Sequence, residues 1–174
     1  NRLWIYPIVI PMIASLVFYN ISYVAKQSFN HAILYYNQGN KDKTRQELSR
    51  GKALSFGQNY EYYLMTATYL YQEIKPLAGR LSEQDFVKAA TPVKNMLDRA
   101  LALNPRSERA YIQYAQLSGI AGLHRTAMGL ESPMYYYEKA MHYNPLFLDT
   151  RLTLFKLYKA TGQEKKAYEI LNDG

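Results

Sequence analysis

The chain has 174 residues, no cysteine and a formal net charge of +7 at pH 7. The absence of cysteine excludes disulfides, zinc–thiolate sites and cysteine nucleophiles. Its basic residues are largely scattered rather than gathered on one face, so nucleic acid is not an expected partner. Beyond the N-terminal segment described next, about 150 residues remain, enough for one domain with a hydrophobic core.

The first predicted element is an uncharged apolar segment, Leu3–Ala25, bracketed by Arg2 and Lys26. About 20 apolar residues, each rising ~1.5 Å, cross a hydrocarbon layer of ~30 Å. Aromatic residues stand toward both ends, as in the belts of membrane interfaces: Trp4, Tyr6, Tyr19 and Tyr23. We therefore predict a transmembrane helix over residues 1–25 and name membrane lipid as a partner.

Three other interpretations of this segment stay open. A signal peptide needs a basic start and a cleavage site, and neither is clear. A buried helix of this uncharged length is unusual, and an interfacial helix should carry a charged face. Pro7 and Pro11 weaken the helix, although membrane helices tolerate proline. The chain starts at Asn rather than Met, so we expect a fragment of a longer protein.

A basic stretch follows the apolar segment and contains Lys41, Lys43, Arg45, Arg50 and Lys52. It is interpreted first as a solvated helix face and second as a contact for acidic lipid headgroups or an anionic glycan carrier. The positive-inside rule taken alone would place this side in the cytoplasm. We expect the N-terminal flank to be cut off, so the comparison of charges is incomplete and leaves the orientation undetermined.

Internal repetition is clearest in the last part of the chain, residues 148–171. Leu154 and Tyr158 lie four apart on one helix face, Gly162 ends that helix, and Ala167 and Leu171 repeat the spacing on a second helix. This order of large, aromatic, Gly, Ala and large residues matches the tetratricopeptide pattern. We predict an all-α fold in which the span continues into a tetratricopeptide-like array of helical hairpins, a right-handed α-solenoid.

The same frame predicts four units within one domain, 26–174. Asn104–Pro105 and Asn144–Pro145 each close a helix, because proline cannot continue one. The first unit is weak, with Thr44 and Gly51 where Ala is usual. The predicted unit boundaries are 25–58, 59–107, 108–147 and 148–171.

Two insertions lengthen the middle units. One is Lys75–Leu81, followed by Ser82 as a predicted N-cap with Asp85 in the first turn. The other is Gly119–Pro133, predicted to be a loop that exposes Leu123 and Met128. Insertions in repeat arrays gather on one face, which often binds a partner, so Leu123 and Met128 are candidate binding residues.

The sequence contains no catalytic set. His31, His124 and His142 are isolated, and none has a second ligand at metal-binding spacing. A phosphate-binding glycine loop and a serine elbow are both absent from the sequence. We therefore assign no catalytic, cofactor-binding or metal-binding residue, and expect no cofactor.

The chain holds 18 tyrosines. Most are expected to pack within and between repeat units. A surplus would line a concave surface and stack on sugar rings or a peptide, since tyrosine combines apolar area with a polar tip. The candidates for this role are Tyr60, Tyr63 and Tyr136.

The order of elements is similar to the C-terminal region of bacterial O-antigen ligases and polymerases, in particular protein O-oligosaccharyltransferases. The segments that carry the resemblance are the apolar span, residues 29–71 and residues 97–117. The resemblance implies a bacterial inner-membrane protein with its repeat domain in the periplasm. The family's catalytic residues lie in an earlier loop, so none is transferred to this chain.

The expected function is a non-catalytic periplasmic repeat domain that positions an acceptor protein or glycan for a membrane glycan transferase. The alternative is a membrane-anchored tetratricopeptide scaffold for envelope or pilus assembly without enzymatic activity. A third interpretation is a cytoplasmic-facing anchor that recruits partners. Whether the parent protein is an enzyme is left open. If the first repeat helix includes Ser28, His31, Ala32 and Tyr35, no linker separates it from the span.

Overall fold

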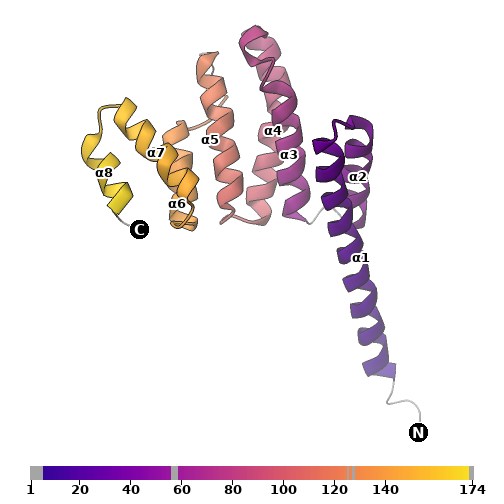
Figure 1. Cartoon of the computed structure of the whole chain (residues 1–174). Coiled ribbons are helices and arrows are strands. Elements are labelled where there is room, and N and C mark those ends of the chain that lie inside the picture. The colour runs from indigo at the N-terminus through magenta and orange to yellow at the C-terminus, as the bar shows by residue number, and fades with distance from the viewer. Residues whose placement is uncertain (1–5, 56–58, 125, 127, 173–174) are drawn as a thin grey trace. The chain divides into compact units, whose positions relative to one another are not determined.

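The chain is described by a computed structural model, which covers residues 6–55, 59–124, 126 and 128–172, with side chains from residue 10 to residue 171. Within these residues it forms eight α-helices and one short 3-10 helix, and no strand (Figure 1). The predicted all-α class is confirmed. Contact clustering divides the chain into two compact units, residues 1–62 (unit 1) and 63–174 (unit 2). The predicted boundary between the apolar helix and the repeat domain, after residue 25, differs from this division and stays a prediction.

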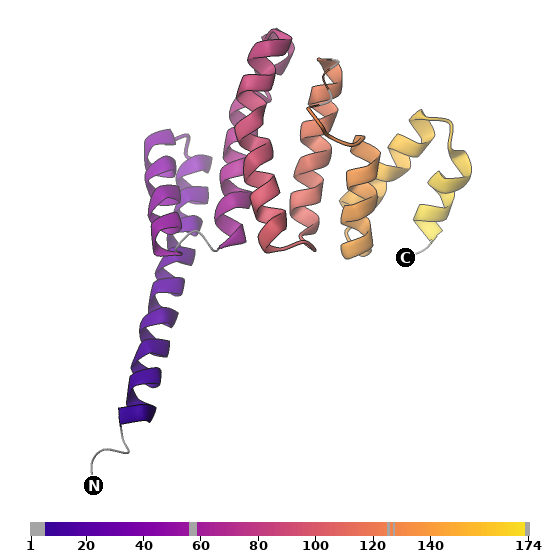
Figure 2. The ribbon, with the colours of Figure 1, turned by 180° about the vertical axis from the view of Figure 1, so that it is seen from behind.

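Unit 1 is built around α1, Tyr6–Asn37, a single helix that continues through Ala25 with Pro11 in its interior. No linker interrupts it between the apolar segment and the first hairpin. Gly39, with φ of +73°, turns the chain into α2, Lys41–Leu54. Asn40 caps α2 by accepting the backbone N–H of Lys43. The two helices lie side by side in opposite directions (Figures 1 and 2).

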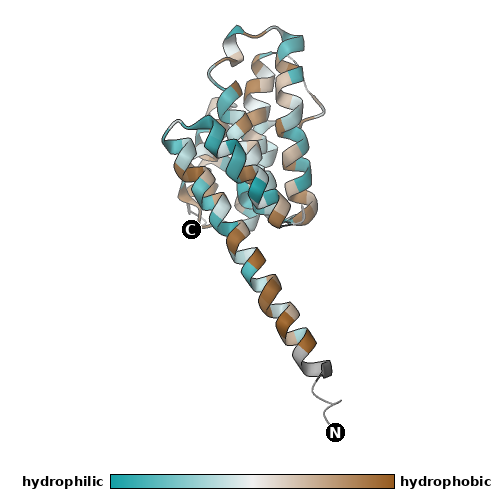
Figure 3. Cartoon of the chain, turned by 90° about the vertical axis from the view of Figure 1, so that its right-hand side faces the viewer, coloured by the Kyte–Doolittle hydropathy of each residue, from teal (hydrophilic) through white to brown (hydrophobic). Residues whose placement is uncertain are grey.

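The N-terminal half of α1 extends past the hairpin and is largely hydrophobic (Figure 3). In the part of the chain that the structure describes, no helix reaches the length and apolarity of a membrane span. The predicted span over residues 1–25 begins with residues 1–5, which lie outside the described residues.

The α1–α2 interface is made close by small residues. Thr44 and Gly51 of α2 are buried, and a Cβ built on Gly51 would lie 2.3 Å from Cε1 of Phe29 on α1. Ala25 and Ala32 are buried on the α1 side. The two residues that made the first unit look irregular in sequence are therefore the ones that let the helices approach.

Unit 2 begins in α3, Tyr60–Ile74, and continues through the 3-10 helix η1, Ala78–Arg80, into α4, Glu83–Leu103. Ser82 caps α4 as predicted, because its Oγ accepts the N–H of Asp85 at 3.2 Å and donates to Asp85 Oδ2 at 2.7 Å. The first insertion is thus a short turn that sets the start of α4.

The next hairpin consists of α5, Glu108–Leu123, and α6, Pro133–Tyr143. As predicted, α4 and α6 end just before Asn-Pro pairs, with Asn104 and Asn144 as their C-caps. The prediction of a loop from Gly119 was wrong for its first residues, because α5 continues to Leu123. Ser118 and Ala121, on the same stretch, are buried and hold it against the rest of unit 2.

The last hairpin pairs α7, Leu148–Ala160, with α8, Glu164–Asn172, across a turn in which Gly162 has a φ of +74°. Its buried residues are Leu154, Tyr158, Ala167 and Ile170. Leu154, Tyr158 and Ala167 are the residues that the repeat pattern singled out. Leu171, which the spacing placed on one face with Ala167, has a side chain that is 39% exposed, and Ile170 takes the inward position.

Candidate aromatic binding site

A pocket of about 240 Å³ opens on unit 2 between α4, α5 and α6. We call it the tyrosine pocket. Its wall combines four tyrosines with three charged residues, and comprises Lys94, Asp98, Leu101, Tyr111, Tyr114, Gly129, Glu131, Tyr135 and Tyr136. The volume lies below the ~300–1,000 Å³ of ordinary small-molecule sites and is enough for a single ring or one side chain.

Polar contacts fix one side of the tyrosine pocket. Lys94 and Asp98 lie four residues apart on α4, and Lys94 Nζ is 2.9 Å from Asp98 Oδ2. The hydroxyl of Tyr114, on α5, donates to the other carboxylate oxygen of Asp98. Asp98 therefore joins α4 to α5, while 52% of its side chain stays accessible to a ligand.

The opposite side is aromatic and is held by the loop before α6. The rings of Tyr114 and Tyr136 stack with centroids 4.9 Å apart, and Tyr135 meets Tyr136 edge-on at 5.4 Å. The backbone N–H of Glu131 donates to the Tyr136 hydroxyl at 3.2 Å, and its carbonyl accepts from the Ser118 hydroxyl at 2.6 Å. These bonds set the height of the loop over α5 and α6.

Burial raises the pKa of Tyr114 above its usual value, and the hydrogen bond to Asp98 adds to the effect. Burial likewise raises the pKa of Tyr111 and of Tyr136. These phenols therefore stay protonated at neutral pH and offer neutral polar groups beside apolar rings.

The predicted binding residues are not brought together. Tyr136 lines the tyrosine pocket but is only 8% exposed, and Tyr63 is 9% exposed, so both serve mainly in packing. Replacing Tyr63 or Tyr136 with Ala would therefore disturb packing as well as any binding. Leu123 is 77% exposed at the end of α5, and Met128 is half-buried with a φ of +45°.

Tyr60 lies in unit 1, where its hydroxyl is 2.7 Å from Glu61 Oε1. It lines a second cavity of about 310 Å³, which we call the α1–α2 groove. The groove is lined by Phe18, Ile21, Ser22, Ala25, Leu54, Ser55, Asn59 and Tyr60. Most of the groove surface is apolar.

Sequence reasoning missed most of the tyrosine pocket. Of its lining residues only Tyr136 was among the candidates, and Tyr111, Tyr114, Lys94 and Asp98 were not singled out as binding residues. The four-residue spacing of the Lys94–Asp98 pair on a predicted helix was an available signal. Nothing local showed that Tyr114 would reach it from the next helix.

The histidines stand apart from one another. His31 and His142 are exposed on helices, and His124 stacks on Phe86 with ring centroids 4.2 Å apart. Among the described residues no group of three or more His, Asp or Glu side chains is arranged to hold a metal ion.

Comparison of the chain with protein-family models finds no match, and comparison with curated proteins finds none either. The interpretation of function therefore depends on the geometry.

Proposed function

We propose that the chain is a membrane-anchored, tetratricopeptide-like interaction domain whose α1 lies partly in lipid. The exposure of apolar side chains along α1 carries the proposal. Leu16, Val17, Phe18 and Tyr19 are consecutive and between 51% and 71% exposed. At about 100° per residue they point to all sides of the helix. A helix that is apolar all round requires an apolar environment, such as a bilayer.

The described side chains of this apolar stretch, from Ile10 to Ala25, are fewer than the ~20 residues that a complete span needs. The proposal therefore includes Leu3–Val9, which belong to the same uncharged run of sequence. Asn20, the most polar residue of the stretch, is compatible with a position in lipid, because its side-chain amide donates to the carbonyl of Leu16 at 2.8 Å. Such local bonding lowers the cost of placing an amide in hydrocarbon.

Unit 2 would supply the binding surface, through the tyrosine pocket and the exposed Leu123. In the interpretation that we favour, it holds an acceptor protein or glycan beside the active site of a membrane glycan transferase in the bacterial periplasm. The support is the resemblance in sequence together with a tyrosine-lined pocket whose carboxylate can accept hydrogen bonds from sugar hydroxyls. A tetratricopeptide-like solenoid is the arrangement of hairpins that this interpretation implies.

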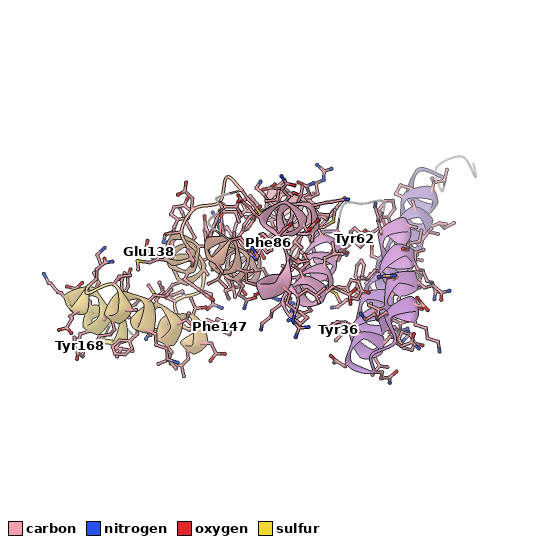
Figure 4. The ribbon with its side chains drawn as sticks, turned by 90° about the horizontal axis from the view of Figure 1, so that it is seen from above. Tyr36, Tyr62, Phe86, Glu138, Phe147 and Tyr168 are labelled. Carbon is pink, nitrogen blue, oxygen red and sulfur yellow. The ribbon has the colours of Figure 1, made fainter. Side chains whose placement is uncertain are left out.

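The second candidate is a scaffold for envelope or pilus assembly with no enzyme attached. Exposed apolar residues around the α6–α7 turn favour a protein partner, among them Leu146, Phe147 and Leu148. Phe147 is labelled in Figure 4. An antibody against unit 2 separates the two candidates. If the full-length protein that the antibody detects in cells is several times heavier than the 20.2 kDa of this chain and has many spans, the transferase is favoured. A protein of similar mass favours the scaffold.

Flotation with liposomes tests the membrane anchor. We expect the chain to float with phosphatidylcholine vesicles and to resist extraction at alkaline pH. The variant Ile13→Asp/Val17→Asp should stay in the dense fraction, whereas Ser49→Asp, on the exposed face of α2, should float. An unmodified chain that sediments without the vesicles would contradict the proposal.

A further inference from the structure

The α1–α2 groove has an apolar wall next to a polar end. Phe18 and Ile21 of α1 and Leu54 of α2 supply the apolar wall. Ser55 and Asn59 supply polar groups beside it. With about 310 Å³, the groove is large enough for part of an extended hydrocarbon chain, and too apolar to attract a small hydrated anion.

Two cations lie one helical turn beyond the groove. Residues four apart share a helix face. Lys26 follows the lining residue Ser22 by four, and Arg50 precedes the lining residue Leu54 by four. α1 and α2 run in opposite directions (Figure 1). The offsets from Ser22 and Leu54 therefore place both cations on the same side of the groove, away from the N-terminal half of α1. Both side chains are exposed.

Unit 1 contains three carboxylates, Asp42, Glu47 and Glu61, and Glu61 Oε1 accepts from the hydroxyl of the groove residue Tyr60 at 2.7 Å. Glu47 is 15% exposed, and its Oε1 is 3.8 Å from Arg50 Nη1. A guanidinium has five N–H donors, so this single long contact leaves most of them for another anion. Asp42 lies in the first turn of α2, at the other end of the helix. Lys52, whose Nζ is 5.6 Å from the centre of the Tyr62 ring, adds positive charge near the groove.

We propose that the α1–α2 groove binds one anionic phospholipid. Its acyl chain lies along Phe18, Ile21 and Leu54, and its phosphate is held by Lys26 and Arg50. A phospholipid has a phosphate next to its hydrocarbon chains. Unit 1 has cations next to an apolar wall, so the phosphate matches the cations and an acyl chain matches the wall. This inference rests on the proposed membrane anchoring of α1, since the groove must lie at the lipid interface to be filled.

Lipid selectivity at a single labelled position tests the site. Because the chain has no cysteine, Ala53→Cys gives one attachment point, exposed on α2 next to Leu54. The chain carrying a bimane fluorophore there is placed in phosphatidylcholine vesicles that contain brominated phosphatidylglycerol or brominated phosphatidylcholine. We expect brominated phosphatidylglycerol to quench the bimane fluorescence at a several-fold lower lipid fraction than brominated phosphatidylcholine does. Lys26→Gln and Arg50→Gln should each reduce this preference about fivefold.

The matched control is Lys41→Gln/Lys43→Gln, which removes two charges from the far end of α2 and should keep the preference. Equal quenching by both lipids would overturn the site while leaving the membrane anchor intact. Equal loss of preference in the control would also overturn it, because a general surface charge would then explain the selectivity. Absence of quenching by either lipid would contradict both the site and the anchor. Circular dichroism of each variant verifies that the helices form.

Discussion

At the residue scale, one contact recurs between successive hairpins of unit 2. The hydroxyl of Tyr114 on α5 donates to Asp98 on α4, and the hydroxyl of Tyr158 on α7 donates to Glu138 on α6 at 2.6 Å. Glu138 is labelled in Figure 4. In each case the hydroxyl of a buried tyrosine binds a carboxylate of the preceding helix. The contact is therefore a repeated feature that joins one hairpin to the next.

Removing one of these hydroxyls should weaken unit 2 without unfolding it. Tyr114→Phe keeps the ring that stacks on Tyr136 and removes the hydroxyl, which donates to Asp98 and lies 3.4 Å from the carbonyl oxygen of Lys94. Since Asp98 remains open to water, we expect the free energy of unfolding to fall by about 1 kcal/mol. Urea unfolding followed by circular dichroism measures the change. Tyr19→Phe, on the exposed part of α1, is the control and should have no effect.

The same contacts predict alkaline sensitivity. Burial, followed by the bond to Asp98 or Glu138, raises the pKa of Tyr114 and of Tyr158 above the usual 10.0. The folded state thus favours the protonated phenols. Their contribution to stability is complete below about pH 10. It is lost as pH rises above that value, because the unfolded chain then releases these protons and the folded chain keeps them.

We expect the urea midpoint to be similar at pH 7 and pH 9 and to fall at pH 11. The fall should be smaller in Tyr114→Phe/Tyr158→Phe than in the unmodified chain. An identical fall in both proteins would show that other groups cause the alkaline sensitivity.

At the element scale, the close approach of α1 and α2 depends on Gly51. Alanine is favoured over glycine in a helix by about 1 kcal/mol. At this position, however, the added Cβ would meet the Phe29 ring at 2.3 Å. We expect Gly51→Ala to lower the free energy of unfolding of unit 1 by about 1–3 kcal/mol. Gly51→Ala/Phe29→Leu should recover part of the loss, and a stabilised single variant would refute the packing argument.

The elements that sequence predicted well are those set by local chemistry. Helix ends before Pro105 and Pro145 follow from the missing N–H of proline, and the Ser82 cap from its own side chain. The sequence did not show which residue at the end of α8 faces the core, because Ile170 and Leu171 are adjacent and both apolar. Contacts made far away in sequence, around Leu154 and Tyr158, choose between them.

The tyrosine pocket was only partly predictable for the same reason. A surplus of tyrosine suggested aromatic binding, but composition cannot tell a lining tyrosine from a packed one. Tyr135 lines the pocket with 41% exposure, and its neighbour Tyr136 is mostly covered by Tyr114. The difference arises from how α6 lies on α5, which involves residues about 20 apart or more.

At the scale of the whole molecule, the tyrosine pocket should act as the ligand contact. Tyr135→Ala removes an exposed ring without opening the core. We expect it to weaken binding of a bacterial O-antigen oligosaccharide by about two- to tenfold, since one aromatic contact contributes about 0.5–1.5 kcal/mol. Titration followed by NMR measures the affinity. Tyr168→Ala, which removes a comparably exposed ring from α8, should bind like the unmodified chain, and equal affinity in both variants would exclude the pocket.

The central claim is that α1 enters lipid and continues without a break into the first hairpin. The most direct measurement is a depth scan by electron paramagnetic resonance, with nitroxides on single cysteines along α1 in phosphatidylcholine vesicles. Residues from Ile10 to Phe18 should be accessible to oxygen and protected from a water-borne nickel chelate. Asn30 and Ile33, beyond Lys26 on the same helix, should show the reverse. Uniform access of the chelate along the whole of α1 would contradict the account.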